Sequence, residues 1–371
     1  MRLMPALLLL VGIGNAIAAA PHDGHLFDQG HAMLSRSEHA DPALDHMKRL
    51  LGQWDVEVAL GSGDKARTSR GRAEITYMNR GYAYQERRHV DGYDEAGNAD
   101  STMSFLVYHP AGKQWGLGEG SSHRESIVIY NGDATSDGLL LRGASRRQGG
   151  MNVTHERLRY RFDSDTAFTV TVDQSSNTED SWNTIETRHY KRAENAEPAL
   201  PTAQDHGRPN ADRAKQSAQF DFLIGEWTAN HEINLQGNWI KFPASTTASY
   251  VMDGYAILEH AWNDLDQNLP DAATSILRLY NRAEQRWESL YLTNRSNSLL
   301  HFGGQKAGNE IVLHSFATNR NDPLQHYVFH DIQTDHYAWY GETSTDRSAS
   351  FNKFWIIDIK RKARIENDDT E

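Results

Sequence analysis

The chain lacks cysteine altogether. This absence excludes structural disulfides, thiolate metal sites, a cysteine nucleophile and the lipid anchor of bacterial lipoproteins. Domains of ordinary size do not need disulfides, so the absence is compatible with an oxidising compartment. The sequence also contains no Gly-x-Ser-x-Gly, no His-Glu-x-x-His, no phosphate-binding glycine loop and no dinucleotide fingerprint. The signatures of common hydrolases, zinc peptidases and nucleotide-binding enzymes are therefore missing.

Positive charge and long apolar runs are scarce too. Lysine and arginine number 38 against 50 aspartate and glutamate residues, which gives a formal charge of −12. Nucleic-acid partners are disfavoured because phosphate contacts require clustered Lys and Arg. No segment approaches the ~18 consecutive apolar residues that suggest a membrane span. We therefore expect neither a nucleic-acid partner nor a membrane span.

The N-terminus has the pattern of a secretory signal. Arg2 supplies positive charge, Ala6–Ile13 an apolar core, and Ala16–Ala18 a small-x-small cleavage site. We expect residues 1–18 to be a cleaved signal peptide, which predicts an exported, soluble, periplasmic protein. A retained N-terminal anchor is the alternative.

Two motifs occur twice at a constant offset of 173 residues. Leu51–Trp54 returns as Ile224–Trp227, and Gly81-Tyr82 returns as Gly254-Tyr255. Solenoid repeats run to roughly 20–50 residues, so a repeat of this size is a duplicated domain. The expected organisation is a mobile His-rich leader (19–40), a first domain (41–192), a linker (193–210), a second domain (211–363) and an acidic tail (364–371).

Each copy is expected to begin with a short helix. In the first copy, Asp41 can cap the helix and Pro42 occupies its first position. Leu44, Met47, Leu50 and Leu51 would form its apolar face. In the second copy the helix is expected over 211–224, with Ala214, Ala218 and Phe222 on one side.

Strand-like segments follow each helix, separated by turn residues such as Met252–Gly254 and Asn321–Pro323. About ten short strands per copy, with no helices between them, predict an antiparallel meander. Closing the meander into a barrel removes its vulnerable edges. The predicted fold class is therefore all-β, with two tandem antiparallel β-barrels. Trp54 and Trp227 would plug the barrel bases, with ligand stacking as the alternative.

Glu86 and Glu259 are the candidate catalytic residues. Strand alternation places each carboxylate on the same face as preceding aromatic side chains. Such a carboxylate could contact a ligand or act as a general acid or base. An internal salt bridge, for instance to Arg142 or Arg188, is the alternative. The candidate ligand-binding residues are Tyr82, Tyr84, Glu86, Trp115, Tyr255, Glu259 and Trp287.

Histidines raise the question of metal binding. His326, His330 and His336 straddle an expected hairpin of the second copy, which makes them weak candidates for a metal site. The leader histidines would bind Zn²⁺ or Cu²⁺ only adventitiously. No cofactor is predicted, and haem or a divalent metal remains a minor alternative.

The second copy resembles the DUF1579-type domains. The resemblance is carried by Phe220–Trp227, Met252–Gly254, Glu259, Tyr280-Asn281 with Arg286-Trp287, and Ile359–Arg361, and in weaker form by the first copy. That family is similar to the calycins, which include lipocalins, fatty-acid-binding proteins and nitrobindins, and it has no general assigned activity. The resemblance implies two calycin-like barrels. The glycines that follow the nitrobindin tryptophan are missing after Trp54 and Trp227, which disfavours haem.

These observations favour a binding protein whose partner is a small apolar or amphipathic molecule. The alternatives are a barrel enzyme of the isomerase, cyclase or hydratase type that uses a buried Glu, and a purely structural interaction module. Arg87–His89 corresponds to His260–Trp262 in the second copy. This divergence is consistent with only one barrel having kept the function. The sequence assigns no oligomeric state.

Overall fold

The computed structural model of the protein describes residues 36–61, 66–146, 153–175, 181–194, 206–263, 273–316, 323–346 and 350–362. The expected signal peptide, most of the leader, part of the linker and the acidic tail lie outside these residues.

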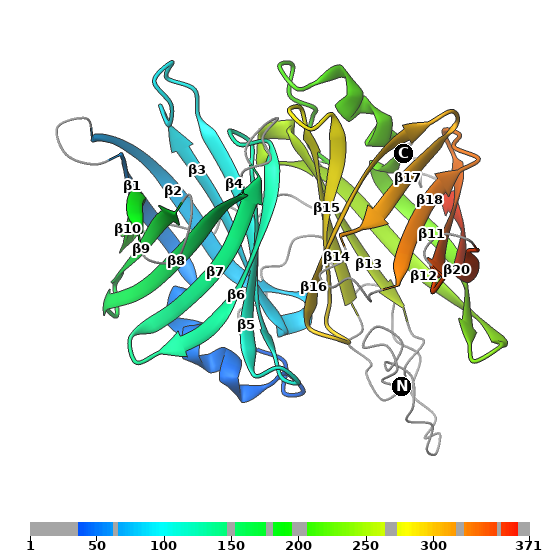
Figure 1. The fold of residues 1–371 in the computed structure, drawn as a ribbon, viewed down its shortest axis with the longest axis horizontal. Coiled ribbons are helices and arrows are strands. Elements are labelled where there is room, and N and C mark those ends of the chain that lie inside the picture. The colour runs from blue at the N-terminus through cyan, green and yellow to red at the C-terminus, as the bar shows by residue number, and fades with distance from the viewer. Residues whose placement is uncertain are drawn as a thin grey trace, which may run out of the picture.

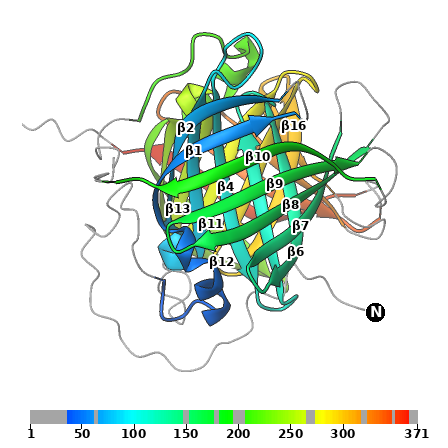
Figure 2. The same cartoon turned by 90° about the vertical axis from the view of Figure 1, so that its left-hand side faces the viewer.

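The chain forms two closed antiparallel barrels of ten strands each, one after the other (Figure 1). In each barrel every strand pairs with its neighbours in the chain, and the last strand pairs with the first. Figure 2 looks onto the first barrel, in which β1, β10, β9 and β8 lie side by side. The predicted fold class of two tandem ten-stranded barrels is confirmed.

The strands of the first barrel are β1 Gly52–Leu60, β2 Arg67–Met78, β3 Ala83–Asp91, β4 Asp100–His109, β5 Gln114–Ser121, β6 Ser126–Thr135, β7 Gly138–Arg146, β8 Val153–Ser164, β9 Ala167–Ser175 and β10 Asn183–Arg192. Those of the second are β11 Gly225–Leu235, β12 Asn238–Val251, β13 Ala256–Asn263, β14 Ala273–Asn281, β15 Arg286–Thr293, β16 Ser298–Ala307, β17 Glu310–Ser315, β18 Leu324–His330, β19 His336–Ser344 and β20 Asn352–Arg361.

Each barrel is preceded by a nine-residue 3₁₀ segment, η2 (Pro42–Leu50) and η5 (Lys215–Leu223), where helices were expected. Asp41 caps η2 as predicted, because its carboxylate accepts a hydrogen bond of 2.8 Å from the Ala43 amide. A 3₁₀ helix repeats every three residues, so side chains at i and i+3 share a face. In η2 the buried residues are Leu44, Met47 and Leu50, as the predicted face required.

The face predicted for the second segment is right for Ala214 and Phe222, which are partly buried and pack against the core, and wrong for Ala218, which is exposed. The fully buried residues of η5 are Ser217, Phe220 and Leu223. The prediction assumed a period of 3.6 residues, and the tighter 3₁₀ period turns a different set of side chains inward.

The tryptophan that opens each barrel packs as a plug in both copies. The indole N–H of Trp54 donates to the Leu50 carbonyl at 2.8 Å, and that of Trp227 donates to the Leu223 carbonyl at 2.7 Å. An arginine from the last strand, Arg192 or Arg361, lies over the indole ring at 4.4 or 4.0 Å from its centroid. The interpretation of these tryptophans as basal packing residues is confirmed.

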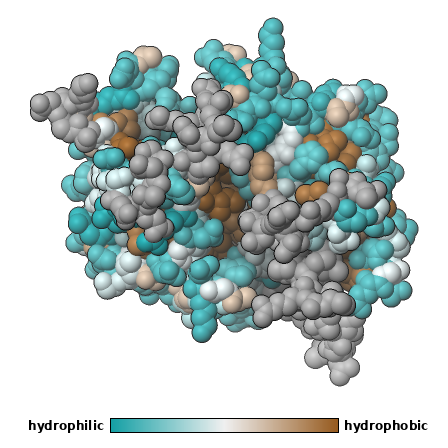
Figure 3. All heavy atoms as spheres, in the orientation of Figure 1, coloured by the Kyte–Doolittle hydropathy of each residue, from teal (hydrophilic) through white to brown (hydrophobic). Residues whose placement is uncertain are grey.

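The two barrels pack against each other with their 3₁₀ segments at opposite ends of the molecule (Figure 1). The contact is an apolar cluster that includes Met103 and Phe105 of β4, Leu277 and Leu279 of β14, and Leu290 of β15. Figure 3 shows a mostly hydrophilic face with hydrophobic side chains gathered where the barrels meet. The cluster makes the two barrels one packed unit.

A strip of glycines on β5 lets the second barrel approach closely. Strand β5 reads Trp-Gly-Leu-Gly-Glu-Gly, with large residues inside the barrel and glycines outside. A Cβ atom on Gly118 would lie 2.5 Å from the methyl groups of Leu290, and one on Gly120 would lie 2.9 Å from Leu277. Side chains at these positions would push the barrels apart.

Candidate functional site

The interior of the first barrel holds a network of ion pairs. Glu86, buried as predicted, accepts hydrogen bonds from the Tyr190 hydroxyl at 2.7 Å and from Arg88 at 3.2 Å. Of the two partners expected for it, Arg142 is exposed, and Arg188 lies inside but binds other carboxylates. The internal salt bridge is present, with Arg88 as the arginine.

Glu119 lies at the centre of this network and is 1 % exposed. Its carboxylate oxygens lie 2.9 Å from Arg188, 2.5 Å from Arg124 and 3.8 Å from Arg88. Burial raises the pKa of Glu119, but these three arginines outweigh burial and hold the pKa well below its usual range. The same balance lowers the pKa of Glu186, which pairs with Arg188 at 2.5 Å. Both carboxylates are therefore ionised at neutral pH.

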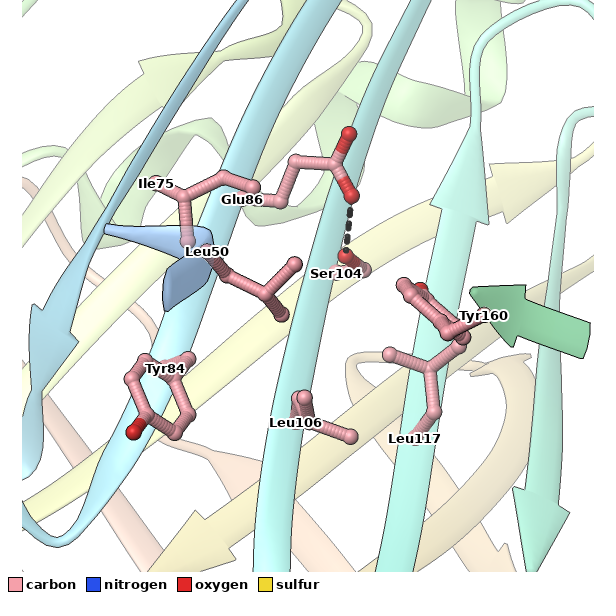
Figure 4. A pocket seen from close by; sticks show the side chains of 8 residues that line it. All are labelled: Leu50, Ile75, Tyr84, Glu86, Ser104, Leu106, Leu117 and Tyr160. Atoms are coloured by element: carbon pink, nitrogen blue, oxygen red, sulfur yellow. Dashed lines mark hydrogen bonds between the residues drawn. The ribbon is translucent and has the colours of Figure 1, made fainter. Parts of the chain in front are cut away.

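Little space remains beside these charges. A cavity next to Glu86 leaves room for about one water molecule (Figure 4). Figure 4 shows Glu86 and Ser104 on one side of it and Tyr84, Leu106 and Leu117 on another. The described side chains thus fill the first barrel around Glu86.

The second barrel replaces nearly all of these charges. The sheet registers of the two barrels match strand by strand, so each inward position has an equivalent. Only Glu86 keeps its charge, as Glu259. The replacements, first barrel then second, are Arg88 by Ala261, Glu119 by Tyr291, Glu156 by Gln325, Glu186 by Trp355, Arg188 by Ile357 and Tyr190 by Ile359.

Aromatic rings line the inner wall of the second barrel instead. Seven rings from seven strands contact one another in sequence at centroid distances between 4.5 and 6.3 Å. We call them the aromatic wall: Tyr291, Phe302, Tyr327, Trp339, Trp355, His231 and Phe242. The equivalent positions of the first barrel hold Glu119, Tyr130, Leu158, Val170, Glu186, Val58 and Ser69.

Solvent reaches the aromatic wall but not its first-barrel counterpart. Tyr291, Tyr327, Trp339 and Trp355 are partly exposed although they face inward, whereas all seven equivalent residues of the first barrel are buried. Leu300, which pairs with Tyr291 and faces the same interior, is 39 % exposed. Inward-facing aromatic side chains that contact solvent are typical of a ligand-binding barrel.

Below the wall, Glu259 is held by two neighbours. Its carboxylate accepts hydrogen bonds from Arg278 at 2.5 Å and from the Thr246 hydroxyl at 3.1 Å. The Arg278 guanidinium also lies 5.4 Å from the ring centroid of Phe220, which belongs to the plug. This pair is the ionic contact of the second interior that corresponds to Glu86 and Arg88.

His231 is held in the wall as a hydrogen-bond acceptor. Its Nδ1 accepts a hydrogen bond of 3.0 Å from the indole N–H of Trp355. Burial lowers the pKa of His231 to about 4, so the ring is neutral at pH 7. With Nδ1 accepting, the proton of the neutral ring resides on Nε2. Iron ligation through this Nε2 would require that proton to move, so the arrangement does not suit haem.

The structure places the other predicted residues of the first barrel in packing roles. Tyr84 donates its hydroxyl hydrogen to the Leu44 carbonyl at 2.6 Å, and its ring stacks on another tyrosine. Tyr82 is buried in the same apolar core, just before β3 begins. Trp115 is buried opposite Tyr108, with which it pairs across β4 and β5.

In the second barrel, two predicted residues lie away from the aromatic wall. Tyr255 precedes β13 and packs against the apolar cluster between the barrels. Trp287 belongs to the plug, where its indole lies 4.7 Å from Phe220 and donates to Gln219 at 3.2 Å. The wall residues carry no recognisable signal in the sequence because they are scattered over seven strands without a shared motif.

The three histidines proposed as metal ligands pair with separate carboxylates. His326 lies 3.2 Å from Glu342 and His336 lies 2.7 Å from Asp358, while His330 contacts the adjacent Asp331. Among the described residues, no group of three or more potential ligands could hold a metal ion. Within the same residues, no helix has the length and apolar character that crossing a membrane requires.

These interiors define a tandem-barrel protein with one charge-filled barrel and one barrel lined by aromatic residues. No protein-family model matches the chain, and no curated protein does. Of what the resemblance to DUF1579-type domains implies, only the two tandem barrels are therefore supported. Among solved structures, the chain is similar to a protein of unknown function from the DUF3598 family of Nostoc punctiforme. The identity is 11 %, 86 % of this chain and 98 % of that one are covered, and the TM-score of 0.25 is too low to carry an argument.

Proposed function

We propose that this protein binds one small apolar or amphipathic molecule per chain, inside the second barrel and without catalysis. The supporting observation is the aromatic wall, which faces inward and is partly exposed, while every equivalent residue of the first barrel is buried. Burying an apolar ligand against such a surface removes apolar area from water on both partners. The first barrel serves as the structural support on which the binding barrel is packed.

Binding is better supported than barrel catalysis. An isomerase, cyclase or hydratase would need a carboxylate free to exchange a proton with its substrate. Glu86 is paired with Arg88, and Glu259 is paired with Arg278. Each carboxylate is therefore held by a guanidinium inside its barrel and is not free to contact a substrate.

The test uses N-phenyl-1-naphthylamine, an apolar dye that fluoresces when it leaves water. The intact protein should bind one dye molecule per chain. Trp339→Ala, which removes a wall residue, should lower the affinity about tenfold through the lost ring contact. The matched control is Val170→Ala, the equivalent change in the first barrel, which should leave dye affinity unchanged.

Two results would contradict the proposal. One is the absence of dye binding to a protein shown to be folded by circular dichroism. The other is a stoichiometry of two dyes per chain with equal sensitivity to Trp339→Ala and Val170→Ala, which would mean that both barrels bind.

The proposed site of action is the periplasm. The signal-like residues 1–18 support export, and the absence of cysteine suits an oxidising compartment. Expression of the full chain in a Gram-negative host should place it in the periplasmic fraction, with an intact mass that lacks the signal. A cytoplasmic protein of full mass would refute export and leave the binding proposal standing.

A further inference from the structure

Among the buried polar atoms of the second barrel that have no hydrogen-bond partner, two donors lie opposite each other on paired strands. The Nε of Arg278 and the Oγ of Ser289 have no hydrogen-bond partner among the described residues. The two residues are 3 % and 1 % exposed. They lie directly opposite each other on the paired strands β14 and β15, and both side chains face the barrel interior. Two unpaired donors therefore converge at one place beneath the aromatic wall.

We infer that this pair binds a carbonyl-type oxygen of the ligand, so that the molecule taken up is a neutral aromatic or apolar carbonyl compound. This inference rests on the proposed binding function and specifies its ligand class. An oxygen with two lone pairs can accept from Arg278 Nε–H and Ser289 Oγ–H together. The apolar body of the ligand would then extend upward along the aromatic wall.

The energetics favour such a contact. A buried donor without a partner is destabilising, and a ligand acceptor removes that cost. A site built around unpaired donors therefore discriminates strongly against molecules that lack the acceptor. Most buried polar groups in proteins are paired, so two adjacent exceptions require an explanation.

The charge balance selects a neutral oxygen over a carboxylate. Glu259 lies 2.5 Å from Nη1 of Arg278 and already neutralises the guanidinium. A ligand carboxylate would add a second negative charge to a buried pair that is neutral overall, and a buried charge without its own counterion is costly. A ketone, ester or amide oxygen accepts the same hydrogen bonds without that charge.

The first barrel lacks this arrangement. The position equivalent to Arg278 is Leu106, and the position equivalent to Ser289 is Leu117. Both leucines are buried in the first core. The unpaired donors are thus confined to the barrel whose wall is accessible to solvent.

The experiment compares three naphthalene probes of nearly equal size by titration calorimetry. They are 2-acetylnaphthalene, which has a neutral carbonyl; 2-ethylnaphthalene, which has no acceptor; and 2-naphthoate, which is anionic. The intact protein should bind the ketone about tenfold tighter than the hydrocarbon, and the carboxylate more weakly than the ketone.

Ser289→Ala is the diagnostic variant. It should reduce the preference for ketone over hydrocarbon to about threefold or less while leaving hydrocarbon affinity unchanged. Because the hydroxyl it removes is unpaired, the variant should melt no lower than the parent protein. Ser69→Ala, the same chemical change on an inward residue of the first barrel, should leave all three affinities unchanged.

Each outcome separates this inference from the proposed function. If no probe binds, the binding function itself fails. If all three bind and Ser289→Ala does not alter their ratio, the function stands and the carbonyl contact is refuted, with water as the partner of the two donors. Tightest binding of the naphthoate would also refute it, because it would assign the site to an anion.

Discussion

Glu119 shows how one buried side chain can support a whole interior. Three arginines surround its carboxylate, and each of them also contacts a second carboxylate of the first barrel: Glu186, Glu156 or Glu86. Removing one partner from a buried ion network leaves uncompensated charge and destabilises a protein strongly. The residue is therefore structural, in contrast to Tyr291 at the equivalent position of the second barrel.

Glu119→Gln should lower the free energy of unfolding by about 3–5 kcal/mol. The glutamine keeps the volume but leaves the arginine charges unbalanced. Urea denaturation followed by circular dichroism measures the change. Glu57→Gln, on the exposed face of β1, should change stability by less than about 0.5 kcal/mol. A loss below 1 kcal/mol for Glu119→Gln would mean that the network contributes little.

His231 predicts a pH dependence of stability. Burial lowers its pKa from 6.5 to about 4 in the folded protein. Between these two values the unfolded chain binds a proton that the folded chain does not bind, so folding becomes less favourable as pH falls. The contribution is absent above about pH 7.5 and reaches about 3 kcal/mol of destabilisation near pH 4.

His231→Gln, which retains an acceptor for Trp355, should therefore gain stability relative to the parent protein as the pH falls from 7 to 4. Urea denaturation midpoints of the variant and the parent protein, measured at pH 7 and at pH 4, give the difference in stability. His39→Gln, at an exposed histidine, should show no such change. Parallel pH profiles for the parent and His231→Gln would contradict the assignment.

At the scale of elements, each barrel is organised by its 3₁₀ plug. In both copies the plug carbonyl receives the indole N–H of the first-strand tryptophan, which fixes the segment against the barrel base. Phe220 of η5 then packs edge-on against Trp287 at 4.7 Å and Phe329 at 5.0 Å. The plug closes the end opposite the partly exposed wall.

Phe220→Ala should remove about 3–5 kcal/mol of stability, because it leaves a cavity beside the rings of Trp287 and Phe329 and the guanidinium of Arg278. Differential scanning calorimetry should record a clearly lower melting temperature. Gln216→Ala, at an exposed position of the same segment, serves as the control. An unchanged melting temperature would mean that η5 is dispensable to the fold.

At the scale of the whole molecule, the two barrels are coupled through one apolar interface. Leucines of the second barrel pack onto the glycine strip of β5. Polar contacts flank the apolar cluster between the barrels. The Asn79 amide donates to the Leu292 carbonyl at 3.2 Å, and His89 lies 2.9 Å from Asp253. We expect the two barrels of the intact protein to unfold in a single cooperative transition.

Gly118→Phe should split that transition into two. The new ring would occupy the space of Leu290, which is fully buried, so the barrels could no longer pack closely. Calorimetry measures the number of transitions. Asp55→Phe, at an exposed position of β1, controls for the added aromatic group. A single transition at the parent temperature would show that the barrels do not depend on this contact.

Several features followed from the sequence alone because they depend on residues close together in the chain. The duplication, the strand alternation, the Asp41 cap, the basal tryptophans and the turn at Gly254 were all predicted from short segments. Gly254 and its repeat equivalent Gly81 have positive φ angles of +84° and +85°. Local sterics and a period of two determine such features without distant contacts.

Which side chains meet inside each barrel was decided only when the strands closed into barrels. Glu119 and Arg188 meet across 69 positions of chain, and Trp355 contacts His231 only because β20 closes onto β11. Alternation separates two faces of a strand, but closure determines which face is inside and which side chains meet there. The sequence by itself therefore determined the duplicated barrel, and the tertiary structure decided that one barrel is filled by its own charges while the other presents an accessible aromatic wall.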